Sequence, residues 1–317
     1  MNCDCDTLKC EIDALKANVD ELFSRSDDLR EELLNIKPTI IAFVADCGTA
    51  GANQEAMAMV VNSFDPEYVV LGGDINYPDG SDADADESLE WANGFIDAEK
   101  ALPVIGNHDD QDDRIPFSEN FLYRKFPYVL VSPKYDYSFV VPGRDLELFF
   151  VYDGYRNDDD ISPLGISGNL SEQARLSERI AASKCTNKII FSHRTIAGPA
   201  INGPGDRYSD DGINNIDLPS LGVKAIFSGH THTAWHARYT SGLLSGLHLV
   251  DCSATTESPR AFESPLALIG AASGLDLLWK YDEETRYAVK ISVFKSKIRV
   301  EFWSFDVDIH HAFDINL

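Results

Sequence analysis

The chain has 317 residues, 44% of them hydrophobic, and a formal net charge of −25 from 52 acidic and 27 basic side chains. This length and apolar content suffice for one large domain, or two small ones, with a true core. The excess of negative charge argues against a nucleic-acid-binding surface and against anionic membranes, since both need basic patches. It favours solubility.

Targeting signals are not evident in the sequence. No apolar run approaches the ~18 residues that a membrane-spanning helix needs. The acidic first residues are followed by no apolar stretch, which is not typical of a signal peptide. The sequence therefore predicts a soluble protein, cytoplasmic or virion-associated, or secreted if a signal was removed. The six cysteines are too few and too irregularly spaced for a disulfide framework. The role of Cys3, Cys5 and Cys10 stays open, with free thiols favoured over a metal site or crosslinks between chains.

The first 37 residues carry an apolar repeat with steps of four and three. Its positions are Leu8, Ile12, Leu15, Val19, Leu22, Leu29, Leu33 and Ile36, with polar Ser26 filling the one gap. This spacing predicts a coiled-coil helix of about four heptads. Leucine dominates one core position, which favours a parallel dimer, with a trimer as the alternative. A single amphipathic helix packed on its own domain is the other interpretation. Pro38 ends the helix, so we expect an oligomerisation segment at 1–37 and a globular domain at 38–317.

The globular part alternates strand-like and helix-like segments. Strands are expected at 39–45, 68–71, 102–105, 137–141, 146–152, 188–191, 223–227, 247–250, 287–294 and 298–305, and helices at 53–64 and 171–183. The acidic stretch 79–87 is interpreted as a solvated loop. Two long polar or glycine-rich segments, 157–168 and 198–212, are expected to shape a pocket with it. This order predicts an α/β fold.

Residues able to bind a metal follow five of these strands. They are Asp46, Asp74, Tyr77, Asn107, His193, His230 and His232. In α/β sheets ligands gather beyond the carboxyl ends of the strands, so these residues should converge on one rim. Seven ligands are too many for one ion. They suit two ions about 3.5–4 Å apart that share one carboxylate.

These residues stand in five ordered blocks. The blocks are Asp46-Cys47-Gly48, Gly73-Asp74-Ile75-Asn76-Tyr77, Gly106-Asn107-His108-Asp109, Ile190-Phe191-Ser192-His193 and Gly229-His230-Thr231-His232. The set resembles the calcineurin-like metallophosphoesterases and, within them, the purple acid phosphatases. Ala45 and Ile190 depart from the usual Gly and Val, and neither is a ligand. The resemblance implies a four-layer α/β/β/α sandwich of two mixed sheets flanked by helices. It does not cover the heptad segment.

The resemblance also implies a placement of two metal ions. Asp46, Tyr77 and His232 would hold Fe³⁺. Asn107, His193 and His230 would hold a divalent ion (Fe²⁺, Zn²⁺ or Mn²⁺), and Asp74 would bridge the two. A free phenol has a pKa near ~10, so it ligates well only beside a strongly Lewis-acidic ion. Related phosphodiesterases have His where Gly48 stands and no tyrosine ligand, so Gly48 and Tyr77 both favour the iron-containing class.

The predicted reaction is hydrolysis of phosphate monoesters by a metal-bound hydroxide. His108 is the expected general acid, oriented by Asp109, and Asn107 and His108 would contact the substrate phosphate. Arg194 and His236 are weaker substrate-binding candidates, for which a surface or structural role is favoured. The substrate would be a phosphorylated small molecule or a phosphoprotein.

Two other functions stay open at this stage. One is a phosphodiesterase or nucleotide phosphatase with two divalent ions. The other is an oligomeric structural protein, such as a virion component, whose metallo-domain binds phosphate without turnover.

Overall fold

The computed structural model describes residues 15, 16, 18, 19, 21–23 and 25 of the N-terminal segment. Beyond it, the described ranges are 37–77, 82–109, 126, 136–151, 170–195, 216–253, 255–257, 274–281 and 285–317. The chain divides into two compact units, Met1–Pro38 and Thr39–Leu317. The segments 157–168 and 198–212, Cys3, Cys5 and Cys10 lie outside the described residues. No helix within the described ranges is long and apolar enough to cross a membrane.

In the first unit, the described residues between 15 and 25 are helical and present apolar side chains to solvent. Leu15, Val19 and Leu22 are 62%, 46% and 65% exposed, and neighbouring Phe23 is exposed as well. Residues spaced by three and four share one helix face. These three are the part of the predicted seam that the structure describes. The coiled coil itself stays a prediction.

The second unit contains two mixed sheets. The first sheet has the order β13-β12-β11-β1-β2-β3. Its strands are β1 (Thr39–Val44), β2 (Tyr68–Gly72), β3 (Ala101–Val104), β11 (Tyr287–Val293), β12 (Lys297–Ser304) and β13 (Ile309–Asn316). Strands β1, β2 and β3 run parallel, while β11 pairs with β1 antiparallel, in a register that sets Ile41 opposite Ile291.

The second sheet has the order β10-β8-β9-β7-β6-β5-β4. Its strands are β4 (Tyr137–Val140), β5 (Leu146–Val151), β6 (Asn187–Ser192), β7 (Val223–Ser228), β8 (Ala234–Tyr239), β9 (His248–Cys252) and β10 (Leu275–Lys280). Strands β5, β6, β7 and β9 are parallel, and β8 pairs with β9 antiparallel. The central strands are buried on both faces, which explains their continuous apolar runs.

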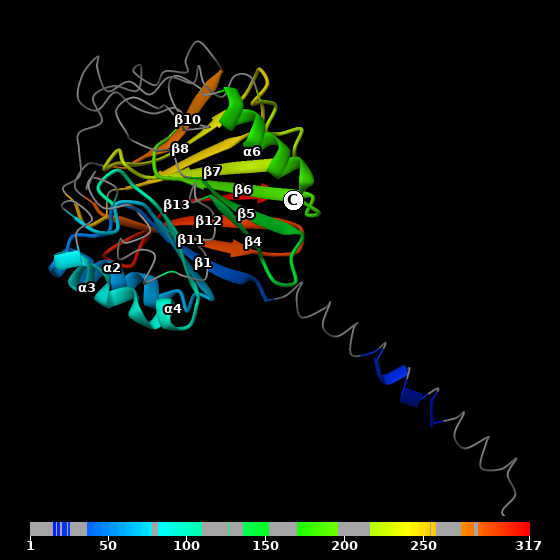
Figure 1. The fold of residues 1–317 in the computed structure, drawn as a ribbon, viewed down its shortest axis with the longest axis horizontal. Helices are drawn as coiled ribbons and strands as arrows, with labels where there is room; N and C mark the ends of the chain where they lie inside the picture. The colour runs from blue at the N-terminus through cyan, green and yellow to red at the C-terminus, as the bar shows by residue number, and fades with distance from the viewer. Residues whose placement is uncertain are drawn as a thin grey trace, which may run out of the picture. The chain divides into compact units, whose positions relative to one another are not determined.

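The core lies between the two sheets. The ring of Phe43 on β1 meets those of Phe191 and Phe227 on β6 and β7, with centroids 5.5 Å apart in both pairs. Helices cover the outer sides. The group α2 (Ala52–Ser63), α3 (Asp82–Leu89), η1 (Glu90–Ala92) and α4 (Asn93–Asp97) lies well apart from α6 (Leu170–Ala182), as Figure 1 shows. Helix α2 contacts β11, and Arg179 of α6 lies over the Phe149 ring of β5. The predicted α/β sandwich of two mixed sheets is confirmed.

The stretch 79–87 corrects one sequence-based expectation. It was predicted to be a solvated loop, but Asp82–Leu89 is helix α3. Acidic side chains near a helix N-terminus interact favourably with the helix dipole. Ser88 and Leu89 at its end are buried. Strands β8, β10 and β13 were also not predicted, because their apolar and polar residues alternate less regularly or include several histidines.

A row of three histidines connects the two sheets away from the strand ends described below. His236 on β8 sets Nδ1 2.9 Å from Nε2 of His311 on β13, and Nε2 2.9 Å from Nδ1 of His248 on β9. The ring of Phe313 stacks on His236 at 3.6 Å. A neutral imidazole has one donor and one acceptor, which is what a ring between two others needs. His236 is thus buried within this row, which agrees with a structural role for it.

The histidine row makes the fold sensitive to acid. Burial, followed by the charges of neighbouring groups that include Arg238, lowers the pKa of His236 to about 2 and that of His248 to about 4. The unfolded chain binds protons at these rings near pH 6.5, whereas the folded chain does not. Stability is therefore present above that pH and lost as the pH falls.

We expect the free energy of unfolding to fall by roughly 3 kcal/mol for each of these two rings between pH 6.5 and pH 4. Urea denaturation across this pH range measures it. The His248→Gln variant should lose the share of this slope that His248 contributes, because one titrating ring of the row is gone. The matched control is His310→Gln, on β13. An equal slope in wild type and His248→Gln would contradict the expectation.

Candidate metal centre

The parallel strands bring the predicted ligands to one edge. Asp46 follows β1, Asp74 follows β2, His193 follows β6, and His230 and His232 follow β7. Strands β1 and β2 are parallel within one sheet, as are β6 and β7 within the other. Backbone hydrogen bonds join the loops within each pair of strands. Asp46 N–H donates to Gly73 O at 2.9 Å, and Gly229 N–H donates to His193 O at 2.8 Å.

One group of side chains surrounds the hydroxyl of Tyr77. Its oxygen lies 3.1 Å from Asp46 Oδ1, 3.0 Å from Asp74 Oδ2 and 3.4 Å from His232 Nε2. His232 Nε2 is also 3.3 Å from Asp46 Oδ1. Four candidate ligand atoms thus crowd together, and one of them belongs to Asp74. This is the set that the sequence assigned to the trivalent ion, together with the predicted bridge.

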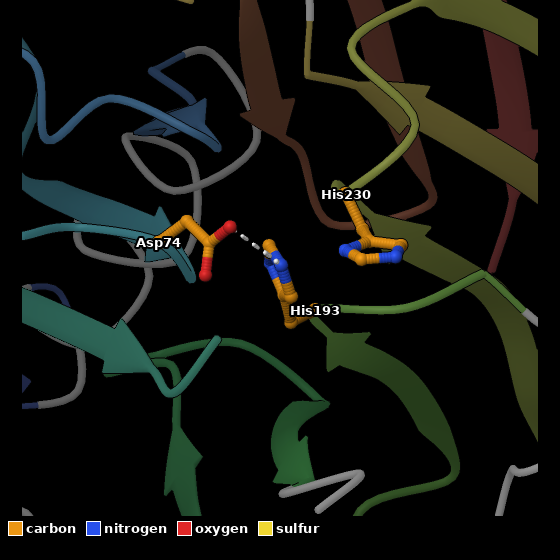
Figure 2. Close-up of side chains that lie close together, drawn as sticks. All are labelled: Asp74, His193 and His230. Carbon is orange, nitrogen blue, oxygen red and sulfur yellow. Dashed lines mark ion pairs between the residues drawn. The ribbon is translucent and has the colours of Figure 1, made fainter. Parts of the chain in front are cut away.

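A second group contains Asp74, His193 and His230, whose ligand atoms all lie within 4.8 Å of one another. Figure 2 shows these three side chains, with the ion pair between His193 Nε2 and Asp74 Oδ2 at 3.3 Å. His193 Nδ1 lies 2.9 Å from the carbonyl of Gly72, to which it donates. That bond places a proton on Nδ1, so Nε2 is the atom that faces Asp74, either as the protonated partner of the ion pair or, without that proton, as a ligand for a cation. Asp74 is the residue common to both groups.

Asn107 supplies a further oxygen. Its Oδ1 is buried and has no hydrogen-bond partner among the described residues. Its neighbours are tied to the same loops, since His108 N–H donates to Asp74 Oδ1 at 2.8 Å and Gly106 N–H to Asp109 Oδ2 at 2.8 Å. A buried amide oxygen without a donor is costly, and a cation would remove that cost. The oxygen, imidazole and phenol donors together fit a dimetal centre.

The electrostatics of the groups suit cation binding. Asp46 and Asp74 are fully buried. Burial favours the protonated form of Asp74, but the charge and hydrogen bond of His193 outweigh it and lower the Asp74 pKa. Burial, then His193 and Arg194, hold the His230 pKa well below its usual value, so this ring is neutral and can ligate. Burial and the two carboxylates raise the Tyr77 pKa strongly, so its phenol stays protonated without a cation nearby.

Four of the predicted ligands have strained backbones. Asp46, Asp74, His230 and His232 have φ angles of 52°, 50°, 70° and 53°, in the left-handed region. They make up four of the seven non-glycine residues with positive φ in the described ranges. Each such residue costs on the order of 1 kcal/mol or more and persists only where the surroundings enforce it. This concentration of strain at one rim is typical of a functional site.

Asp109 is one of the groups that enforce this backbone. Its Oδ1 accepts the N–H groups of Ile75 and Asn76 at 2.9 Å and 3.0 Å, and its Oδ2 accepts that of Gly106. Burial and the charge of Asp74 raise the Asp109 pKa to about 8, against the pull of these N–H groups. We expected Asp109 to orient His108. These bonds make Asp109 a clamp between the loop after β2 and the loop after β3, and its expected role in orienting His108 stays a prediction.

Two glycines allow the loops to approach closely. A Cβ on Gly48 would lie 2.4 Å from the backbone nitrogen of Asn76. A Cβ on Gly73, at φ +91°, would lie 2.3 Å from His193 Nδ1. No side chain fits at position 48, so the histidine that related phosphodiesterases carry there has no room beside this loop.

The candidate substrate-binding residues have different surroundings. The His108 ring packs on Tyr77 with centroids 4.5 Å apart, its Nε2 is 3.9 Å from Asp74 Oδ2, and its side chain is 32% exposed. It therefore stands at the rim between the centre and solvent. Arg194 follows His193, is half-buried, and its charge acts on His230. His236 lies in the histidine row, where its two ring nitrogens face His248 and His311.

Sequence reasoning missed the segment after β9. Thr255 Oγ1 and Thr256 Oγ1 both donate to the carbonyl of Asp46 at 2.8 Å. Thr255 Oγ1 also donates to the carbonyl of Ala45. These hydrogen bonds hold the backbone of Asp46 in its strained conformation. The sequence did contain a signal for this segment. The predicted strand 247–250 is followed by one acid and three hydroxyl residues, and the rule that ligands gather at strand ends, which identified the metal ligands, applies there too.

Fold and site together define a class: an α/β sandwich with a dimetal-type ligand set at its strand ends, the architecture of a metallohydrolase. The family model of the calcineurin-like phosphoesterases matches residues 39–234, more than half of the chain. The chain belongs to this family. A search of curated proteins found no match.

Solved structures support the fold. Purple acid phosphatase from yellow lupin (Lupinus luteus) seeds is 13% identical with a TM-score of 0.60, over 88% of this chain and 53% of that one. The chain thus spans about half the length of the lupin enzyme. The anchor protein of the inner membrane complex of Plasmodium is 14% identical, with a TM-score of 0.58 over 89% of both chains. A dimetal phosphatase from Danio rerio is 14% identical, with a TM-score of 0.55 over 88% of this chain and 99% of that one.

Proposed function

We propose that the protein hydrolyses phosphate monoesters with a centre of the purple acid phosphatase type, Fe³⁺ paired with Fe²⁺, Zn²⁺ or Mn²⁺. The observation that carries the proposal is the position of the Tyr77 hydroxyl, within 3.4 Å of Asp46, Asp74 and His232. A phenol whose pKa is raised by burial and by two carboxylates needs a strongly Lewis-acidic ion before it ionises. The purple acid phosphatase among the similar structures agrees with this class.

Each group of ligands has a separate task in this proposal. Asp46, Tyr77 and His232 hold the trivalent ion, while Asn107, His193 and His230 hold the divalent ion, with Asp74 shared. Bound metals of this kind polarise the phosphate and supply the attacking hydroxide. The protein's own residues bind the phosphate and handle the leaving group.

His108 and Arg194 act on the substrate. His108 is partly exposed, packs on Tyr77 and lies next to Asn107, so its ring can reach a phosphate ester at the rim. It gives its proton to the leaving alkoxide oxygen, while the attacking oxygen bonds to phosphorus from the opposite side. Arg194, whose charge reaches His230, pairs with a non-bridging phosphate oxygen. His108 thus makes the largest difference for poor leaving groups.

Two specific features favour alternative functions. The ligand set without tyrosinate ionisation would serve two divalent ions, as in a phosphodiesterase or nucleotide phosphatase. The similar Plasmodium structure is that of an anchor protein, and this chain has an exposed apolar N-terminal face. A structural protein whose metallo-domain binds phosphate without turnover is therefore the second candidate. Colour and turnover separate the three.

We expect the purified iron-loaded protein to absorb in the visible range, because tyrosinate transfers charge to Fe³⁺. Tyr77→Phe should abolish this band and lower kcat by about tenfold to a hundredfold without abolishing it, since other ligands remain. Absorption spectra and hydrolysis of an aryl phosphate measure both. Tyr68→Phe, on β2 and packed against Phe139, is the matched control.

The opposite results have clear meanings. A colourless protein with full activity in Mn²⁺ or Mg²⁺ would establish the divalent phosphodiesterase class instead. Tight phosphate binding with no hydrolysis under any metal would establish the structural candidate.

For His108→Ala we expect a loss of kcat that depends on the leaving group. Alkyl phosphates, whose alkoxides need a proton, should lose about 10²–10⁴-fold, while nitrophenyl phosphate should lose far less. A series of phosphate monoesters with graded leaving-group pKa values measures this, with His310→Ala as the control. Equal losses across the series would remove His108 as the acid and leave it a phosphate-binding role.

We also propose that residues 8–36 join the chain to further copies of itself, as a parallel dimer or, alternatively, a trimer. The exposed Leu15, Val19 and Leu22 support this, because three large apolar side chains on one helix face gain free energy when a second helix covers them. Phosphate chemistry at the metal centre does not require this contact.

Replacing Leu15 and Leu22 together by Asn in the full chain should dissociate the oligomer. Each substitution puts a polar group where an apolar seam is expected, at a cost that weakens association by more than a hundredfold. Sedimentation velocity gives the molecular mass. Glu21→Gln, one position from the seam, should leave it unchanged. A wild-type chain that sediments as a monomer, or a double variant that stays oligomeric, rules the coiled coil out.

A further inference from the structure

A buried polar network lies directly behind the loop that carries His230 and His232. Ser253 Oγ donates to Asp251 Oδ1 at 2.7 Å and accepts the N–H of Thr233 at 3.1 Å. The same hydroxyl lies 3.1 Å from Thr231 Oγ1, which in turn bonds the hydroxyl of Thr233. All four side chains are fully buried.

Two members of this network, Thr231 and Thr233, belong to the loop itself. Thr231 separates His230 from His232, and Thr233 follows His232, so the hydroxyls hold the loop on both sides of the second histidine. Both histidines have left-handed φ angles of 70° and 53°. A strained backbone returns to ordinary φ values unless neighbouring groups hold it. Ser253 N–H also donates to Thr233 O at 2.9 Å, which closes the link to β9.

Asp251 is the anchor of this network and an unusual residue for its position. It lies on β9, is wholly buried, and has an Oδ2 without a hydrogen-bond partner among the described residues. A buried ionised carboxylate without a cation is far too costly to keep. Burial raises its pKa well above the usual value, which agrees with a neutral carboxylic acid. An apolar side chain would be cheaper there unless the carboxyl group had a task.

We propose that Asp251, through Ser253 and the Thr231–Thr233 hydroxyl pair, is a positioning residue that sets the His230–His232 loop for metal binding. This inference rests on the proposed function in that the loop holds two of the metal ligands. It assigns a purpose to a buried acid whose side-chain hydrogen bond goes to Ser253 rather than to His230 or His232. The network acts before any ion binds, because it holds the backbone of the loop rather than an ion.

The first test uses Ser253→Ala in the full chain, which removes the hydroxyl that bonds both Asp251 Oδ1 and the N–H of Thr233. Without metal, amide hydrogen exchange at residues 229–233 should speed up by about tenfold or more, with the remaining amides unchanged. With Mn²⁺ as the probe, followed by electron paramagnetic resonance, the dissociation constant should rise about 10- to 100-fold. Ser245→Ala, at an exposed turn before β9, is the matched control.

The second test compares two replacements of Asp251. Asp251→Asn keeps an acceptor for Ser253 and a neutral side chain, so Mn²⁺ affinity should stay within about threefold of wild type. Asp251→Leu has similar size and no polar atom, so it should reproduce the Ser253→Ala loss. Rescue by Asn is the result that mere filling of space would not give. If Asp251→Leu does not fold, Ser253→Ala carries the comparison.

The outcomes separate this inference from the proposed function. Wild-type exchange and wild-type Mn²⁺ affinity in Ser253→Ala would overturn the positioning role. Faster exchange in Ser253→Ala, in a protein whose wild-type form binds no Mn²⁺, would refute the metal centre and still support the role of Asp251 in setting the loop.

Discussion

Two carboxylates, Asp46 and Asp74, lie fully buried beside one phenol, and the arrangement of the strand ends depends on keeping them there. Buried acids normally gain a proton or a counter-charge. Asp74 stays ionised although it is buried. The charge and hydrogen bond of His193 compensate for its burial and keep its pKa low. The negative charge of the two buried carboxylates is therefore only partly compensated by the protein, and two metal ions would compensate the rest. The other candidate ligands are imidazole groups and one amide, which can bind a cation without adding further negative charge.

Convergence of the ligands on one centre also explains the positive φ angles of their backbones. Ligand atoms at five different strand ends converge only if several backbones leave the ordinary φ range, and those of four ligands do. The cost is offset from outside the site. Asp109 holds three N–H groups of two loops, and the Thr255 and Thr256 hydroxyls hold the Asp46 carbonyl. The sheets bring the ligands near one another, because parallel strands end at a common edge. The hydrogen bonds of Asp109, Thr255 and Thr256 then fix the exact positions of the loops.

The parts of this design differ in how readily the sequence reveals them. Buried parallel strands are continuous apolar runs, and the ligand motifs follow them directly, so β1, β2, β6 and β7 and the residues after them could be predicted. Helix α3 could not, since its sequence of alternating acids and alanines has no apolar stripe. Strands β8 and β13 carry His236 and His311, which hide the apolar alternation. The hydrogen bonds that hold the loops escaped notice because Ser and Thr are common everywhere, and only the structure shows which hydroxyls face a strained carbonyl.

The net charge of the chain sets the order in which ligands can bind. A protein of charge −25 repels phosphate anions in general. Without a cation the site adds two carboxylates, and its imidazole at His230 is neutral rather than charged. The guanidinium of Arg194 and a partly exposed His108 do not outweigh that surplus. Under the proposed function, affinity for a phosphate ester would therefore depend on prior cation binding. The acidic surface then becomes an advantage, because it draws cations toward the rim and leaves the loaded centre as a favourable place for a phosphate.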